Sequence, residues 1–315
     1  MSREFFLDLA ARGVRFPIGT DLVLHDEGDA DAIVRDGERL GRVVERAARH
    51  WGIPLGFPLM DLEHAADGHS PEYNALIGAV RYIAQRTDLI PCAMLIGPFS
   101  LATKLARDPI TAVALAGRGV ASNDEPLVGE IENSLAEAER RVNCAMEAAL
   151  EAGARVIIVC EPAASIAYFS PRQLRAGAAI FRRYVMEPNL RLKSALDQAG
   201  ASLIFHDCGE LTPEMVHAFG YEIHPVMLSL GSSRKLWEDA ERVPRDVILY
   251  GNLPTKTFYC DSTMPDDAVC ERTSELLQRM QECGHPFILG SECDVLDVPG
   301  HGEAIRRKVK LMLAC

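Results

Sequence analysis

The chain has 315 residues, 48% of them hydrophobic and 25% charged, and its formal net charge is −12 at pH 7. This composition permits a large buried core without disulfides, and the negative charge argues against a protein that binds a nucleic-acid backbone. No run of 18 uncharged apolar residues and no signal-peptide pattern is present, so we expect a cytoplasmic protein without a membrane partner.

The predicted elements alternate between strands and helices along the chain. The first 50 residues are expected to form a helical extension. Short apolar runs with β-branched residues then predict buried strands, which we place within 52–61 and at 92–96, 155–160, 202–206, 222–230, 247–250 and 286–289. Helical periodicity is found at 32–50, 72–87, 129–152, 172–199, 266–283 and 303–314. This order predicts an α/β protein, a (β/α)8 TIM barrel with an N-terminal helical extension, in which residues 1–315 form a single domain.

Barrel enzymes carry their chemistry on the loops that follow the strands, so the residues at these positions are informative. His206 and Cys208 follow one predicted strand, and Cys293 follows a later one. Alternation along an extended chain directs residues 206 and 208 to the same side, and Cys293 can approach from across the barrel mouth. Two thiolates and an imidazole suit Zn²⁺, and three protein ligands are typical of a catalytic site. We therefore predict that His206, Cys208 and Cys293 bind zinc.

The charge of such a site favours one kind of chemistry. Zn²⁺ with two thiolates and a neutral histidine is nearly neutral, which makes it a poor Lewis acid for a carbonyl group. It is better suited to bind an incoming thiol and hold it as a nucleophilic thiolate. Alkyl transfer to sulfur is the reaction expected.

The nine cysteines are an odd number and contain no CxxC pair. This usage fits a reducing compartment, in which most cysteines are small buried hydrophobic residues. We expect a packing role for Cys144, Cys270 and Cys283, which lie in helix-like segments.

Several motifs together resemble the uroporphyrinogen decarboxylase superfamily over nearly the whole chain. These motifs are GPFSLA at 97–102, EPAAS at 161–165, SPRQL at 170–174, HDCGE at 206–210, GNLPT at 251–255 and ILGSECDVLDVPGHGEAIRRKV at 288–309. The H-x-C pair and the late cysteine are similar to the zinc motif of methylcobamide:coenzyme M methyltransferases and related corrinoid-dependent enzymes. By this resemblance too, His206, Cys208 and Cys293 are the metal ligands.

The sequence departs from both branches of this superfamily. The decarboxylases grip porphyrinogen carboxylates with an R-Q-A-G-R stretch, whereas the corresponding region here reads ARGVRFPIGTD, with only Arg12 and Arg15. In the late loop, SECDV replaces the S-x-G-C form that is commoner in the methyltransferases.

The resemblance also implies a cofactor and a partner. The methyl donor would be methylcobalamin on a separate corrinoid protein, and the acceptor would be coenzyme M or another small thiol. Asp61 and His64 would contact the substrate or the corrinoid, with metal binding or a plain surface role as the alternatives. A homodimer is compatible with the sequence, which does not determine the oligomeric state.

Two further residues at strand ends are candidates for catalysis. Glu161 would complete the zinc shell or accept the proton of the thiol, or else form an ion pair at the rim. Asn252 would bind substrate or orient a ligand, or else serve as a turn residue.

The predicted function is therefore a zinc-dependent methyltransferase that moves a methyl group between a corrinoid protein and a thiol. A close variant removes methyl groups from methoxylated or methylated substrates. The alternatives are a metal-free lyase like uroporphyrinogen decarboxylase and a non-catalytic corrinoid-binding or chaperone protein.

Overall fold

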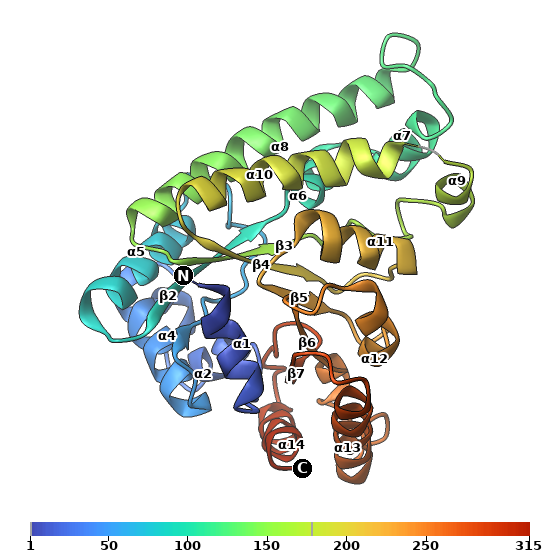
Figure 1. Cartoon of the computed structure of the whole chain (residues 1–315). Coiled ribbons are helices and arrows are strands. Elements are labelled where there is room, and N and C mark those ends of the chain that lie inside the picture. The colour runs from blue at the N-terminus through green and yellow to red at the C-terminus, as the bar shows by residue number, and fades with distance from the viewer. Residues whose placement is uncertain (1, 178) are drawn as a thin grey trace.

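The strands of the protein form one parallel sheet in the order of the chain. The computed structural model describes residues 2–177 and 179–315. The strands pair in the sequence β1 to β7: β1 (Leu55–Gly56), β2 (Ile90–Ile96), β3 (Val156–Cys160), β4 (Ser202–Asp207), β5 (Met227–Leu230), β6 (Ile248–Leu253) and β7 (Phe287–Ser291). Because every neighbour is parallel and separated by a helical crossover, the sheet curls with helices on its outside (Figure 1).

The segment before β1 occupies the remaining strand position of the barrel. Arg15 forms an isolated parallel bridge with Leu289 of β7, and Ile18 forms another with Asp294. On its other side, the hydroxyl of Thr20 donates a hydrogen bond of 2.8 Å to the carbonyl of Phe57, just after β1. The predicted barrel fold is confirmed, although this eighth position is held by two bridges in place of a regular strand.

Helices cover the outside of the sheet, and four of them precede β1 in the chain. They are α1 (Arg3–Ala11), α2 (Thr20–Leu24), α3 (Ala30–Ile33), α4 (Gly37–Trp51), α5 (Pro71–Arg86), α6 (Pro98–Leu105), α7 (Pro109–Ala116), α8 (Pro126–Glu151), α9 (Pro171–Arg175), α10 (Glu187–Gln198), α11 (Pro213–Ala218), α12 (Leu236–Asp239), α13 (Asp266–Cys283) and α14 (Gly302–Ala314). The predicted N-terminal helical extension corresponds to α1–α4. Within it, Asp36 caps α4 by accepting hydrogen bonds from the N–H groups of Glu38 and Arg39.

Two predicted elements differ from those observed. The helix predicted over 172–199 is divided into α9, a π-helical turn at Arg182–Met186 and α10. Pro188 lies at the start of α10, and its missing N–H prevents a regular hydrogen bond in the preceding turn. The strand predicted over 222–230 is shorter, because His224, with a φ of 50°, ends the preceding helical turn before β5 begins.

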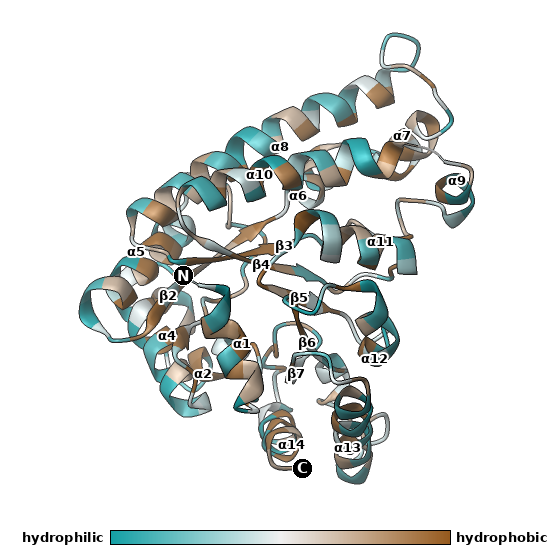
Figure 2. Ribbon diagram, in the orientation of Figure 1, coloured by the Kyte–Doolittle hydropathy of each residue, from teal (hydrophilic) through white to brown (hydrophobic). Residues whose placement is uncertain are grey.

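The core lies between the sheet and its helices. All residues of β3, β4 and β5 are buried, and the helices alternate hydrophobic and hydrophilic positions (Figure 2). The long helices α8 and α10 lie side by side, where Glu139 accepts two hydrogen bonds from Arg191. Burial of apolar surface on this scale is the main stabilising contribution to such a barrel.

The structure corrects the packing roles predicted for Cys144 and Cys270. Cys144 is exposed, and Cys270 forms a disulfide with Cys315. The pair joins the first turn of α13 to the end of α14. The two cysteines are 45 residues apart and share no motif, so their pairing is not predictable from the sequence. Among the described residues, no helix is both long enough and apolar enough to cross a membrane.

Candidate metal centre

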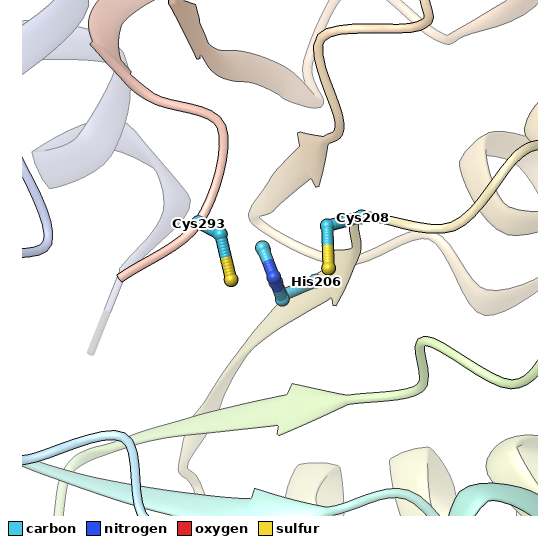
Figure 3. Close-up of side chains that lie close together, drawn as sticks. All are labelled: His206, Cys208 and Cys293. Carbon is cyan, nitrogen blue, oxygen red and sulfur yellow. The ribbon is translucent and has the colours of Figure 1, made fainter. Parts of the chain in front are cut away.

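His206, Cys208 and Cys293 meet at the barrel mouth. One potential ligand atom from each residue lies within 4.8 Å of the other two. His206 and Cys208 come from the end of β4, and Cys293 comes from the loop after β7, so that both sulfur atoms and the imidazole face a common space (Figure 3). This is the only such group of potential metal ligands in the described part of the chain. The structure thus brings together the three residues predicted to bind zinc.

The imidazole of His206 is fixed by the neighbouring strand. In the sheet register His206 stands opposite Ser229 of β5, and its Nδ1 atom lies 2.8 Å from the Ser229 hydroxyl. The ring is buried, and its Nε2 atom has no hydrogen-bond partner in the described structure. A buried ring nitrogen normally has a partner, so this free atom is the expected donor to a metal ion.

The two thiols affect each other's pKa. A hydrogen bond from Cys293, opposed by burial and supported by His206, lowers the pKa of Cys208 to about 3. The same hydrogen bond raises the pKa of Cys293. The thiolates also raise the pKa of Lys256, although its partial burial acts in the opposite direction. The site therefore holds a negative charge that attracts a cation.

The loop after β5 packs directly against Cys208. A Cβ atom at Gly231 would lie 2.7 Å from the carbonyl oxygen of Cys208, so only glycine permits this approach. The side-chain amide of Asn252 donates hydrogen bonds of 2.8 Å to the carbonyls of Gly231 and Arg234. Asn252, predicted as a catalytic residue, is thus buried beside the cluster and holds the loop that borders Cys208.

Glu292 connects the loops on the other side of the cluster. Its carboxylate accepts a hydrogen bond of 2.6 Å from the Ser232 hydroxyl and one of 3.3 Å from the backbone N–H of Lys256. Glu292 directly precedes Cys293, so these bonds fix the backbone that carries the second thiol. The roles of Ser229 and Glu292 are not predictable from the sequence, because they depend on strand register and on the folding of the loops.

Glu161 lies at the end of β3, but its carboxylate faces α6. It accepts hydrogen bonds from the backbone N–H groups of Phe99 and Ser100 at 3.4 and 2.5 Å, and from the side chain of Asn189 at 3.0 Å. Burial raises its pKa, and these hydrogen bonds oppose that effect. A Cβ atom at Gly97 would lie 2.0 Å from this carboxylate, so the glycine leaves room for it. Glu161 is outside the three-residue cluster, and its catalytic role stays a prediction.

Asp61 and His64 form a local pair in the loop after β1. The carboxylate of Asp61 lies 2.7 Å from Nδ1 of His64 and accepts a second bond from the His64 backbone N–H. This hydrogen bond raises the pKa of His64. Both side chains are partly exposed and also lie outside the cluster, so contact with a substrate or corrinoid stays a prediction.

Two carboxyl groups next to the ligands are buried, although the sequence favours a solvated position for Asp207. Asp207 and Asp294 are each at most 6% exposed, and oxygen atoms of both lack a hydrogen-bond partner in the described structure. Burial raises the pKa of Asp294 to about 8, and the nearby Asp21 adds to this effect. Ionisation of a carboxyl group in the protein interior costs free energy. Sequence position alone does not reveal such burial.

Comparison with known proteins places these features in a family. The model of the family described as "Uroporphyrinogen decarboxylase (URO-D)" matches residues 58–299. No curated protein sequence matches the chain. Among solved structures, the chain is similar to a "methyltransferase from Methanosarcina mazei", with a TM-score of 0.69 and 15% sequence identity over 99% of this chain and 98% of that one. At this identity the likeness demonstrates a common fold.

Proposed function

Because the chain belongs to the uroporphyrinogen decarboxylase family, whose model matches most of its length, we propose a specific function for its barrel mouth. The protein is a zinc-dependent methyltransferase that moves a methyl group between a methylcorrinoid protein and a thiol. The observation that carries this proposal is the meeting of His206, Cys208 and Cys293. The name of the structurally similar methyltransferase supports the same reaction class.

The residues of the cluster fit zinc. Two thiol sulfurs and one imidazole nitrogen match the donors that Zn²⁺ prefers, and the unpartnered Nε2 atom of His206 supplies the nitrogen. When bound, zinc would keep the sulfur of an incoming thiol in its nucleophilic thiolate form at neutral pH. Three protein ligands leave a coordination position for that sulfur.

The surrounding residues would orient the ligands. With a metal ion bound to Nε2 of His206, the Ser229 hydroxyl would accept the Nδ1–H of the same ring. Glu292 and Asn252 hold the loops that carry Cys293 and border Cys208. The cationic Lys256 stabilises negative charge on sulfur. Together these contacts keep the site preorganised.

The methyl donor is methylcobalamin on a separate corrinoid protein. Methyl transfer would break the carbon–cobalt bond of the donor, leave its electron pair with the corrinoid, form a carbon–sulfur bond and release the thiol proton to solvent. Asp61 and His64, in the loop after β1, would contact the corrinoid or the substrate. We place the reaction in the cytoplasm. A metal-free lyase would not require this thiol cluster.

The test combines metal analysis with methyl transfer. The purified protein, without a metal-chelating tag, is expected to hold about one zinc per chain. With free methylcobalamin and 2-mercaptoethanesulfonate as probes, it should accelerate loss of the methylcobalamin absorbance and form a thioether. Cys208→Ala and Cys293→Ala should lose both properties, whereas Cys144→Ala, a matched change on an exposed helix position, should retain them. Zinc that is absent, or unaffected by both cluster variants, would overturn the proposal.

A further inference from the structure

A cavity lies at the opposite end of the barrel from the metal centre. Its volume is about 780 Å³, and its walls come from α1, α13 and the segments that lead into the barrel at Gly13–Arg15 and Gly284–Phe287. These segments adjoin the N-terminal end of β7, whereas Cys293 follows its C-terminal end. The cavity is therefore separate from the proposed active site, and its size is that of a small-molecule site.

Most of the cavity wall is apolar. Leu7 projects from α1, Leu277 and Met280 project from α13, and Val14 and Phe287 line the side next to the sheet. Apart from Met280, which is buried, these side chains remain partly exposed because α1 and α13 do not close over them. Such a surface gains free energy when an apolar group covers it.

Arg15 supplies a cation at the edge of this apolar surface. The residue lines the cavity, and its guanidinium donates one hydrogen bond of 3.3 Å to the carbonyl of Leu313 on α14. No carboxylate of the described chain forms an ion pair with it, although acidic residues exceed basic ones by 12 (45 against 33). By contrast, the nearby Arg12 is exposed and pairs with Asp8. Most donors of Arg15 are left for an external acceptor.

His285 adds a second unsatisfied group to the same wall. It lines the cavity, is 4% exposed, and its Nε2 atom lies 2.9 Å from the carbonyl of Val247. A carbonyl only accepts, so Nε2 is the protonated nitrogen, and Nδ1 is left without a partner in the described structure. A buried polar atom without a hydrogen-bond partner is unusual in the core of a folded protein.

We propose that this cavity is a binding site for a small organic anion with an apolar body, such as a medium-chain carboxylate. The acidic group would bind the guanidinium of Arg15, and the hydrocarbon chain would cover Leu7, Leu277 and Phe287. Charge-assisted hydrogen bonds from arginine to a carboxylate are among the stronger polar contacts in proteins. The site is independent of the metal centre.

Octanoate is a suitable probe, and isothermal titration calorimetry with the full-length protein measures its binding. We expect a dissociation constant on the order of 1 mM or lower, consistent with the affinity of small ligands. Arg15→Gln should weaken binding about tenfold, because a charged hydrogen-bond donor is lost. Leu277→Trp, which fills the cavity, should abolish it. Arg12→Gln, a matched change on an exposed neighbour, should bind like the wild type.

Circular dichroism and zinc content establish that each variant is folded, so that a loss of binding is not a loss of structure. Octan-1-ol has the same chain without the charge. It should bind the wild type more weakly than octanoate does. Its affinity for Arg15→Gln should equal its affinity for the wild type. The proposal is overturned by absence of octanoate binding to the wild type, by equal effects of the Arg12 and Arg15 substitutions, or by equal affinity for octanoate and octan-1-ol.

Discussion

The Nδ1 atom of His206 lies 2.8 Å from the hydroxyl oxygen of Ser229, on the strand next to it in the barrel. This contact determines which ring nitrogen faces the two thiols. Since Nδ1 is engaged, Nε2 is the atom free to bind a metal ion, and its lack of any partner in the described structure agrees with this role. A hydroxyl on β5 thereby orients the ring of a ligand on β4.

Ser229→Ala should therefore weaken metal binding. Loss of an outer contact to a ligating histidine typically lowers metal affinity about 10- to 100-fold. Competition with a chromogenic chelator measures the affinity. The visible spectrum of the Co²⁺-substituted protein reports the ligand geometry. Ser229→Thr keeps the hydroxyl and should restore both signals. If Ser229→Ala binds zinc as tightly as the wild type, Ser229 does not orient the ligand.

Glu161 provides a test that separates a structural role from a catalytic one. Its carboxylate accepts three hydrogen bonds from buried donors of α6 and Asn189. Glu161→Ala leaves these donors unsatisfied, so the free energy of unfolding should fall by about 2–4 kcal/mol, as measured by urea denaturation. Zinc content should be unchanged. The matched change at the exposed Glu151 should have little effect on stability. Loss of zinc with unchanged stability would instead identify Glu161 as a ligand.

The sequence was most informative about residues whose chemistry follows from their type and from their position at the end of a strand. The strands at 92–96, 155–160 and 202–206 were predicted within about two residues of their observed bounds. His206 and Cys208 were recognised because a strand end and an alternating pattern together place both side chains on one side. Cys293 was recognised because parallel strands end at the same face.

Contacts between distant segments were not predictable in the same way. The pairing of Ser229 with His206 depends on strand register, and the bonds of Glu292 depend on how two loops fold. The orientation of Glu161 toward α6 depends on the space left by Gly97. Residues 15–18 complete the barrel through two isolated bridges. Pro17 interrupts this segment and lacks a backbone N–H, which argues against a strand when only the sequence is considered.

Asn252→Asp should loosen the loop that borders Cys208. The amide of Asn252 donates to the carbonyls of Gly231 and Arg234, and a carboxylate in its place would face these two acceptors without a proton. We expect the free energy of unfolding to fall by about 2 kcal/mol or more, because a buried charge is left unpaired. Limited proteolysis should show faster cleavage near residues 231–235. Unchanged stability and cleavage would contradict the proposed anchoring.

The pair of Asp61 and His64 predicts a pH dependence of stability. The hydrogen bond to Asp61 raises the pKa of His64 above its unfolded value of about 6.5. A raised histidine pKa contributes stability that is fully present below pH 6.5 and is lost as the pH rises through the folded pKa. Asp61→Asn removes the charged acceptor, so it should destabilise the protein more at pH 5.5 than at pH 8.5. Denaturant unfolding at both pH values measures the difference. In a His64→Gln background, the effect of Asp61→Asn should be the same at both pH values. A difference that persists there would assign the pH dependence to another group.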